Sequence, residues 1–598
     1  MLIFTSNLYL KYLTSFLSAT KVYRQFLRNH SIVVYKLKMN EAILLHEEGS
    51  DIFTMSLRYV QSDLNIDRQF NFNRRINEPI SNFTRRIKTN IGLQVMKKMY
   101  CKQKKHSDFE TPLSVLLNDT DNNHIKFVRD SSILDDNDTC KTILENSSNV
   151  KLIIFNTEYV LRQNIPFITK IELPSSILVD FPVYPSKFEG KNVNKLKSTF
   201  TWYKNEGKEW IQVGQDFLYV PCMSDIGSKL KISCVPRNDT ECGPIIEITS
   251  NNAVQNGPVS CPFETRHAFT KYKLSGKSFR VTSYNILANI YSETQLSQET
   301  LYPYCPLYAL SMDYRKLLIL KELMGYKSDI ICLQEVDNSV YKNDLQLALR
   351  VLHYDSIYNL KNDLREGLAI FYNQDRFDKL YSDYSVISQG VSLDDFNIIL
   401  SKIENNNAKQ TFGNRNTIIQ ILILRSKENP EILVIGNTHL YFLPIADHVR
   451  LLQAYYGLLY LRTYAKRVKN ENPECNVSIL YCGDFNSTPD KGIYQLMTQN
   501  YITKDHSDWR ADPTEMVQDV VLTHDLNLSS ACGIPEYTNF TATFSGCLDY
   551  IFYQTDYLAV EQVIPIPSKE TLKTYTGLPS IVFPSDHLSL CVDLKWLK

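Results

Sequence analysis

Along the C-terminal half of the chain, short runs of apolar residues repeatedly end in a polar residue of a kind that can act on a substrate. Apolar runs of four to eight residues with turn residues on either side predict buried strands. Six of them carry asparagine, glutamate, aspartate or histidine at one end: Asn285, Glu335, Asn437 with His439, Asp484 with Asn486, Asp549, and Asp586 with His587. One such residue usually hydrogen-bonds its own turn. Six in order predict a reactive site along one edge of a sheet, because a packed sheet gains no stability from polar groups gathered there.

The sequence Gly-Asp484-Phe-Asn486 directly follows the apolar run 477–482. It places a carboxylate and an amide oxygen at the end of a buried strand, and both are ligands suited to a hard cation such as Mg²⁺. A phosphodiesterase must neutralise charge on phosphorus, position a water and stabilise the leaving oxygen. A magnesium ion held by few carboxylates meets the first and last of these needs. These strand ends therefore predict a magnesium-dependent phosphodiesterase, with Mn²⁺ as a substitute cofactor.

The same segments resemble the endonuclease/exonuclease/phosphatase superfamily, and within it the deadenylase branch. The resemblance covers about residues 275 to 598 and rests on these motifs: Ser-Tyr-Asn285-Ile-Leu-Ala, Leu301-Tyr-Pro-Tyr-Cys-Pro, Asp313-Tyr-Arg, Ile331-Cys-Leu-Gln-Glu335-Val-Asp, Asn437-Thr-His439-Leu-Tyr, Cys482-Gly-Asp484-Phe-Asn486-Ser-Thr-Pro, Gly546-Cys-Leu-Asp549-Tyr-Ile and Pro584-Ser-Asp586-His587. It implies an α/β fold, a DNase I-like two-sheet α/β sandwich flanked by helices. Every core position of the superfamily is filled, which implies an active enzyme.

The resemblance implies a metal site made by Glu335, Asp484, Asn486 and Asn285. Glu335 is the first-choice ligand, and Asn285 steadies Glu335 and the ion. Asp484 orients the attacking water or accepts its proton. Asn486 holds the metal or a phosphate oxygen.

The resemblance also implies two catalytic histidines, each with an acidic partner. His587, oriented by the adjacent Asp586, acts as a general base, since an imidazole with an ordinary pKa of about 6.5 can accept a proton at neutral pH. His439 hydrogen-bonds the scissile phosphate, and Asp549 fixes its tautomer.

Substrate contacts are expected beside the same edge. Arg365 begins one strand and Arg415 precedes another, and an arginine fork suits phosphate oxygens. A solvated arginine at a strand end is the alternative for each. Tyr441 and Phe442, directly after His439, are the expected partners for stacking bases of a single strand.

The implied function is a magnesium-dependent 3′-to-5′ exoribonuclease that releases AMP from 2′-5′-linked oligoadenylate and from the 3′-5′ poly(A) tails of mitochondrial RNA. The expected partners are RNA with adenylate 3′ ends and 2′-5′ oligoadenylate, with no insertion into a membrane and no protein partner that the sequence indicates. The alternatives are another hydrolase of the superfamily, such as an NADP(H) 2′-phosphatase or a DNA endonuclease, and a non-catalytic RNA-binding factor. The complete set of polar positions argues against the last, and the tyrosine-rich segment after Leu301 favours a deadenylase.

Composition narrows the picture further. A chain of 598 residues predicts about three domains, at about 100 to 200 residues each. Lys and Arg together number 65, as do Asp and Glu, so no overall charge draws the protein to long duplexes and recognition is expected in a groove. The 13 cysteines include no C-x-x-C pair, which indicates reduced thiols of an intracellular protein and argues against a zinc site.

Residues 1–38 contain six basic residues and no Asp or Glu. A basic, acid-free, Ser-containing start is typical of a mitochondrial transit peptide and predicts the mitochondrial matrix. Lys11 interrupts the apolar stretch, which argues against a secretory signal, and the stretch is shorter than the about 20 residues that span a bilayer. A start at Met39 would give a cytosolic form.

Three further segments complete the expected organisation. Residues 39–122 mix short apolar runs with basic clusters and predict a partly disordered basic segment, which is a solvated face or adds RNA affinity. Residues 123–262 carry short alternating runs between turns and predict a small antiparallel β-sandwich accessory domain, with an immunoglobulin-like corner at 219–230. Residues 263–278 are the expected connector to a catalytic domain at 279–598.

Overall fold

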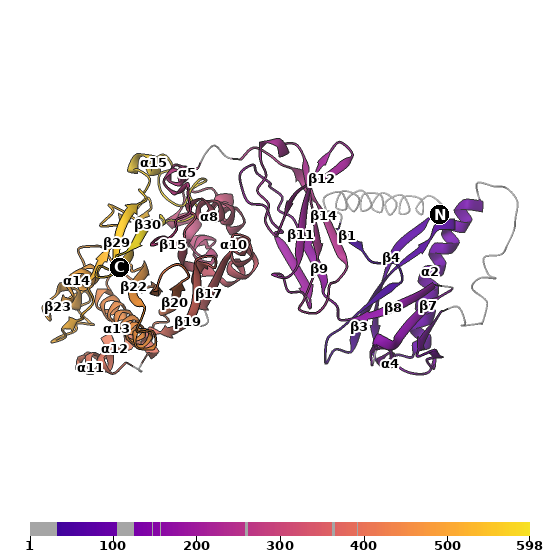
Figure 1. Ribbon diagram of the computed structural model, residues 1–598, viewed down its shortest axis with the longest axis horizontal. Helices are drawn as coiled ribbons and strands as arrows, with labels where there is room; N and C mark the ends of the chain where they lie inside the picture. The colour runs from indigo at the N-terminus through magenta and orange to yellow at the C-terminus, as the bar shows by residue number, and fades with distance from the viewer. Residues whose placement is uncertain are drawn as a thin grey trace, which may run out of the picture. The chain divides into compact units, whose positions relative to one another are not determined.

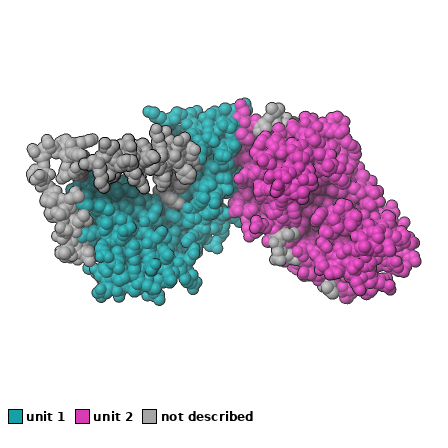
Figure 2. Space-filling model, turned by 180° about the vertical axis from the view of Figure 1, so that it is seen from behind, with its two compact units in different colours: residues 1–177, 184–255 teal, residues 178–183, 256–598 magenta. Residues whose placement is uncertain are grey.

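The computed structural model describes residues 33–103, 125–145, 147–155, 157–257, 261–361, 365–390 and 393–597. The chain forms two compact units rather than the expected three (Figure 2). The N-terminal unit comprises residues 1–177 and 184–255, and the C-terminal unit comprises 178–183 and 256–598. The short segment 178–183 belongs to the C-terminal unit because Phe181 packs with Cys261 and Phe263.

Two six-stranded sheets form the centre of the C-terminal unit (Figure 1). In order across the first sheet, the strands are β17 (Tyr354–Leu360), β18 (Glu366–Asn373), β16 (Ile330–Asp337), β15 (Ser278–Asn285), β30 (Leu590–Trp596) and β29 (Leu558–Val563). In the second sheet they are β19 (Phe377–Val386), β20 (Ile418–Ser426), β21 (Glu431–His439), β22 (Asn476–Asp484), β28 (Asp549–Gln554) and β25 (Leu528–Ser530). The two-sheet α/β sandwich predicted from the resemblance is confirmed.

The two sheets enclose an apolar core, and helices cover their outer faces. Strand β21 shows the pattern, because Leu433 and Ile435 pack between the sheets. Ile432 and Val434 lie in the cluster that contains the buried side of helix α13 (Asp447–Glu471). Since side chains alternate along a strand, a strand that is buried on both faces is apolar at nearly every position. This accounts for the continuous apolar runs in the sequence.

Shorter elements surround this core. The helices are α5 (Glu264–His267), α6 (Asn289–Ser292), α7 (Leu307–Leu310), α8 (Met312–Tyr326), α9 (Asn338–Val340), α10 (Gln346–Arg350), α11 (Asp394–Lys402), α12 (Asn406–Gly413), α14 (Gly492–Gln499) and α15 (Lys569–Lys573). Two small hairpins pair β23 (Tyr501–Ile502) with β24 (Leu522–Thr523) and β26 (Asn539–Phe540) with β27 (Ser545–Gly546).

The strand ends that carry the polar residues meet at one edge of the sandwich. β15 and β16 run parallel, as do β21 and β22, so that the carboxyl ends of each pair lie together. β28 runs antiparallel to β22, which puts its first residue, Asp549, opposite Asp484. His439 is in register with Asp484 on the other side. The strand ends thus converge, as the sequence pattern predicts.

The N-terminal unit contains two larger sheets and a two-stranded one (Figure 1). The seven-stranded sheet has the order β4 (Ile66–Arg75), β3 (Ile52–Gln61), β2 (Glu41–His46), β8 (Thr157–Gln163), β7 (Val150–Ile154), β5 (Ile125–Arg129), β6 (Ser132–Ile133). The five-stranded sheet has the order β1 (Val33–Lys36), β14 (Ile245–Ala253), β13 (Lys229–Val235), β11 (Thr199–Glu206), β12 (Glu209–Gln215), and β10 (Lys187–Lys191) pairs with β9 (Phe167–Glu172). Among the described residues of this unit, the α-helices are α2 (Ile80–Gln103) and α4 (Lys141–Leu144).

The structure corrects the expectation of a partly disordered segment at 39–122. β2, β3, β4 and α2 lie within this range and share one apolar core with the strands that follow residue 125. β2 pairs in parallel with β8, so that the expected boundary at 122 falls inside a single sheet. In β3 and β4 the buried apolar residues alternate with Arg, Asn and Gln. A strand that is buried on one face only therefore reads as a polar, basic segment.

Two other expected segments differ from the structure or lie partly outside it. The expected connector 263–278 belongs to the C-terminal unit, where the buried Arg266 donates hydrogen bonds to the hydroxyls of Tyr326 and Ser589. Of the expected transit peptide, residues 1–32 lie outside the described residues, and β1 pairs with β14. Within the described ranges, no helix has the length and apolar character needed to cross a membrane.

Candidate active site

A cavity of about 580 Å³ opens at the edge where the strand ends meet. Its walls include most of the predicted site residues: Glu335, His439, Asp484, Asn486, Asp586, His587, Arg415, Tyr441 and Phe442. Asn285 and Asp549 are buried and reach these residues through hydrogen bonds. Arg365 is exposed and does not line the cavity. For Arg365 the structure favours the alternative of a solvated arginine.

A bulge in β16 aims Glu335 into the cavity. The pairing of β16 with β18 shifts in register between Leu333 and Val336, and Glu335 has a φ of 55°, in the left-handed region. A bulge turns a side chain away from the regular alternation of its strand and is common beside active sites. The Glu335 carboxylate accepts hydrogen bonds from Asn285 Nδ2 at 3.0 Å and from the backbone N–H of Ala288 at 2.8 Å.

Asn285 joins two carboxylates from different sheets. Its Nδ2 donates to Asp484 Oδ2 at 3.0 Å as well as to Glu335 Oε1. Its Oδ1 accepts a hydrogen bond from the backbone N–H of Leu287. Asn285 therefore steadies Glu335, as expected, but its amide oxygen is turned away from the carboxylates and is not offered to a metal ion. This differs from the expectation that it is a ligand.

Burial and the closeness of other carboxylates raise the pKa values of Glu335 and Asp484. Burial, followed by the charges of Asp586 and Glu366, raises the pKa of Glu335 to about 7. Burial and the charge of Asp549 raise the pKa of Asp484 to about 6. Desolvation and a nearby like charge both disfavour an ionised carboxylate. These residues consequently carry an electrostatic cost that a bound cation would relieve.

The Gly-Asp-Phe-Asn turn is held by close backbone approach. A Cβ on Gly483 would lie 2.1 Å from the carbonyl oxygen of Thr438, so only glycine lets β21 and β22 come together here. Asn486 has a φ of 48°, which asparagine tolerates. Its backbone N–H donates to Asp484 Oδ1 at 2.9 Å, and its Nδ2 donates to the carbonyl of Leu440 at 3.0 Å. The amide oxygen of Asn486 remains for a ligand in the cavity.

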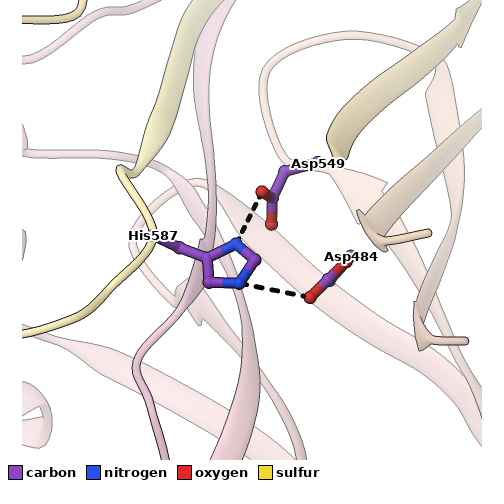
Figure 3. Close-up of side chains that lie close together, drawn as sticks. All are labelled: Asp484, Asp549 and His587. Carbon is purple, nitrogen blue, oxygen red and sulfur yellow. Dashed lines mark hydrogen bonds and ion pairs between the residues drawn. The ribbon is translucent and has the colours of Figure 1, made fainter. Parts of the chain in front are cut away.

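Asp549, and not the neighbouring Asp586, holds His587 (Figure 3). His587 Nδ1 lies 2.8 Å from Asp549 Oδ2, and its Nε2 lies 3.6 Å from Asp484 Oδ2. Asp586 accepts a hydrogen bond from the hydroxyl of Tyr302 at 2.9 Å. The expected orientation of His587 by Asp586 is therefore wrong, because the side chains of these consecutive residues take different partners.

The charges around His587 favour its protonated form. Burial alone would lower the pKa of His587, but the carboxylates of Asp549 and Asp484 raise it well above its ordinary value. The hydroxyl of Thr538 donates to Asp549 Oδ2 at 2.6 Å and helps to fix that carboxylate. Within the described part of the chain, the buried Oδ1 of Asp549 has no hydrogen-bond partner.

His439 contacts a lysine where an acidic partner was expected. Lys361 Nζ lies 2.9 Å from His439 Nδ1 and 3.0 Å from Glu366 Oε1. An ammonium group can only donate, so Nδ1 accepts and the proton of the neutral ring is on Nε2, which lies 3.6 Å from Asp484 Oδ2. Burial and the charge of Lys361 hold the pKa of His439 well below its ordinary value. The expected pairing of His439 with Asp549 is wrong, because that carboxylate bonds the other histidine.

Aromatic side chains line the mouth of the cavity. The guanidinium of Arg415 lies over the ring of Tyr441, with Cζ 4.4 Å from the ring centroid. The ring of Phe442 is 5.4 Å from that of Tyr441, and Phe442 is 69% exposed. These three residues can stack against a flat ligand and contact its charge.

The model of the Endonuclease/Exonuclease/phosphatase family matches residues 282–587, a range that contains every strand end around the cavity. The chain belongs to this family. A second model, for the N-terminal domain of proteins like 2′,5′-phosphodiesterase 12, matches residues 165–255 in the N-terminal unit. The resemblance drawn from the strand-end motifs is thereby confirmed, and the protein is a hydrolase of phosphate esters.

Relatives match over most of the chain. The 2′,5′-phosphodiesterase 12 of Mus musculus is 38% identical over 470 residues, which cover 74% of this chain and 76% of the relative. That of Homo sapiens is 36% identical over 469 residues, with the same coverage of 74% and 76%. The CCR4-Not complex 3′-5′-exoribonuclease subunit Ccr4 of Yarrowia lipolytica is 29% identical over 360 residues, which cover 54% of this chain and 48% of the relative.

Members of the endonuclease/exonuclease/phosphatase family are typically metal-dependent, and the buried donors here fit a cation. Asp484, Asp549 and His587 place one ligand atom each within 4.8 Å of one another. Glu335 and Asp484 converge on one amide nitrogen, and both have raised pKa values. A cation beside Asp484 would offset the mutual repulsion of these carboxylates.

Sequence reasoning missed several residues of this family site. Lys361, before β18, and Glu366, the first residue of β18, gave no signal beyond an ordinary charged segment, although Glu366 directly follows the arginine that was singled out. Tyr302 lies in the quoted Leu301-Tyr-Pro-Tyr motif and reaches Asp586. Arg315 ends the quoted Asp313-Tyr-Arg motif, is fully buried, and donates to the carbonyls of Leu287 and Pro584. The two motifs contained these last residues, but only their contacts reveal what they do.

Proposed function

We propose that this protein is a Mg²⁺-dependent 3′-to-5′ exoribonuclease that releases AMP from 2′-5′-linked oligoadenylate and from 3′-5′ poly(A) tails of mitochondrial RNA. The observation that carries the proposal is the 38% identity to a 2′,5′-phosphodiesterase 12 over 74% of the chain. The named activity of the more distant Ccr4 subunit, a 3′-5′-exoribonuclease, supports the direction of attack.

Glu335, Asp484 and Asn486 are the residues that would hold the magnesium ion, which supplies positive charge to the phosphate and to the leaving oxygen. Asp484 Oδ2 faces both histidines and accepts the proton of the attacking water. His439 donates its Nε2–H to a non-bridging oxygen of the scissile phosphate. All four residues line the cavity.

His587 exchanges a proton through Nε2, because its Nδ1 is held by Asp549 at 2.8 Å. A carboxylate in this position fixes the ring orientation and stabilises the imidazolium. The carboxylates of Asp549 and Asp484 favour the imidazolium form of His587, and this form gives its Nε2 proton to the leaving oxygen. Tyr441, Phe442 and Arg415 then hold the terminal adenosine, with the rings against the base and the guanidinium near a phosphate.

The test is release of AMP from 2′-5′-linked triadenylate and from 3′-5′ oligo(A), compared with oligo(U), single-stranded DNA and NADPH. The proposal expects both adenylates to be degraded in Mg²⁺ and neither in EDTA. Asp484→Asn, which keeps the size of the side chain and removes its charge, should abolish release. Arg365→Gln is the matched control, since this exposed arginine lies outside the cavity.

If the protein consumes DNA or NADPH and leaves the adenylates intact, the proposed substrate is wrong, although hydrolysis of phosphate esters is retained. Full activity of Asp484→Asn would overturn the site. RNA binding without any hydrolysis by the wild-type protein in Mg²⁺ or Mn²⁺ would favour the non-catalytic alternative.

For the location, the proposal is the mitochondrial matrix, supported by the six basic and no acidic residues among residues 1–38. A fluorescent reporter fused to residues 1–38 should enter mitochondria. The same fusion with all six Lys and Arg replaced by Gln should remain outside. A reporter fused to the chain from Met39 onward tests the cytosolic form.

A further inference from the structure

Helix α2 in the N-terminal unit is strongly basic, although the chain as a whole has equal numbers of basic and acidic residues. Its 24 residues include six Lys and Arg and no Asp or Glu. Arg85, Arg86, Lys97 and Lys98 are exposed. Phe83, Ile87 and Ile91 of the same helix are buried in the core of the seven-stranded sheet. The helix packs on the seven-stranded sheet (Figure 1) and exposes these cations to solvent.

Three cations of α2 lack the carboxylate partners that several other exposed cations of this unit have. Lys151 pairs with Glu158 at 2.9 Å, Lys170 with Glu172 at 2.9 Å, and Lys197 with Asp239. By contrast, Arg86, Lys97 and Lys98 make no ion pair or hydrogen bond with a described side chain. Unpaired cations keep their full field and attract an anion that comes from elsewhere.

The spacing suits a chain of anions better than a single one. Arg86 and Lys97 are eleven residues apart, which is about three helical turns, so they lie on the same side of α2 and about 16 Å apart along its axis. No one phosphate can contact both. A strand of several nucleotides can, and it releases a counterion at each phosphate that it places beside a cation.

An anionic membrane is the other polyanion to consider, and α2 is poorly built for it. A helix that lies in a membrane interface inserts a continuous apolar face. The apolar face of α2 is already used in the protein core, and the large apolar residues exposed on its described part are Leu93 and Met99. The observations therefore favour RNA.

We propose that the exposed cations Arg86, Lys97 and Lys98 of α2 form a second RNA-binding site that holds the phosphates of a long adenylate strand. This rests on the proposed function for the identity of the strand. The site adds affinity for long substrates, because a strand held at two points gains effective concentration at each. It adds nothing for a trinucleotide.

The test compares full-length Arg86→Gln/Lys97→Gln/Lys98→Gln with the wild type and with a matched control, Lys151→Gln/Lys170→Gln/Lys197→Gln, which loses the same charge from paired positions of the same unit. Binding of fluorescent 30-nucleotide oligo(A) in EDTA is measured from 50 to 200 mM salt. With a slope of about 0.7 per phosphate for single strands, loss of three contacts should reduce the slope of log K against log salt by about 2. The control should change it by less than about 0.5. Turnover of 2′-5′ triadenylate should be the same in all three proteins.

Equal weakening in both triple variants would overturn the proposal in favour of a general charge effect. Binding of the wild type, but not the α2 variant, to vesicles with one third phosphatidylserine, with oligo(A) binding unaffected, would assign the surface to a membrane and overturn it as well. Failure of this inference can be told apart from failure of the proposed function. If the protein hydrolyses no adenylate but the α2 variant still loses affinity for oligo(A), the RNA-binding site is supported and the proposed function is not. Thermal unfolding curves of the variants should match that of the wild type, since the changed side chains are exposed.

Discussion

The two histidines that face Asp484 are held in opposite ways. Both are buried, and the Nε2 of each lies 3.6 Å from the same oxygen, Asp484 Oδ2. On the other side of the ring, His587 Nδ1 meets the carboxylate of Asp549 at 2.8 Å, whereas His439 Nδ1 meets the ammonium of Lys361 at 2.9 Å. The two rings thus lie at the same distance from Asp484, but their different partners at Nδ1 favour different protonation states.

The difference shows that position in the cavity does not assign a role to a histidine. A carboxylate behind the ring favours the imidazolium, and an ammonium behind it enforces a neutral ring with its proton on Nε2. His587 can therefore exchange a proton, while His439 is a fixed donor. In the proposed mechanism, the half of the site with Asp549 therefore moves protons, and the half with Lys361 binds the phosphate.

Removal of the carboxylate behind His587 is expected to have the largest effect. Asp549→Asn should lower kcat for AMP release by about 10³- to 10⁴-fold, as for the loss of the charge behind a catalytic histidine. Steady-state release from triadenylate measures this. Asp586→Asn is the matched control, because Asp586 contacts Tyr302 instead. A loss that is as large in Asp586→Asn as in Asp549→Asn would contradict the pairing found here.

Removal of the ammonium behind His439 is expected to have a smaller effect. Lys361→Met alone would leave the buried carboxylate of Glu366 without its ammonium partner. The double variant Lys361→Met/Glu366→Gln is therefore better, since it removes both charges of the pair. We expect about a 10- to 100-fold loss of kcat, in the range for residues that orient a catalytic group. Glu366→Gln alone, which retains the ammonium, should lose much less. An equal loss in both variants would assign the effect to Glu366.

A double-mutant cycle tests whether Lys361 acts through His439. His439→Gln retains an N–H donor near the position of Nε2 and lacks the acceptor that Lys361 contacts. In that background, Lys361→Met/Glu366→Gln should cost less than about threefold, because groups that act through one another are non-additive. A full additive loss would mean that Lys361 acts directly on the substrate.

The smallest expected effect is on stability, and its sign differs between the two rings. The pKa of His587 is raised in the fold, so its contribution is fully present below the unfolded pKa of about 6.5 and is lost as pH rises through the folded pKa. The pKa of His439 is lowered, so its contribution is present above about 6.5 and is lost as pH falls. In EDTA, His587→Gln should lower the urea midpoint more at pH 6 than at pH 9. His439→Gln should lower the urea midpoint less at pH 5 than at pH 8. The same trend in both variants would contradict the assignment of opposite partners.

Much of the C-terminal unit was predictable, because its strands are buried on both faces. Strand β21 contains the unbroken apolar run 432–435, and its last residue, His439, marks the edge of the sheet. The N-terminal sheet was missed for the converse reason. β4 buries Phe70 and Phe72 on one face and presents arginine and asparagine on the other, so that its composition resembles that of a solvated linker.

The partners of the histidines were not predictable. Asp586 is next to His587 in the sequence, yet the bond is made by Asp549, 38 residues away. Lys361 is 78 residues from His439 and lies in no motif. The bulge that turns Glu335 inward depends on the pairing of two strands and leaves no mark in the apolar pattern.

The elements of the C-terminal unit and the reactive residues at their ends follow from the sequence, because apolar periodicity and residue type are local properties of the chain. Tertiary packing sets which histidine faces a carboxylate and which an ammonium, and it makes the basic helix α2 a folded surface. Proton state and charge pairing depend on contacts of about 3 to 4 Å between residues far apart in sequence, and those distances exist only once the sheets have packed.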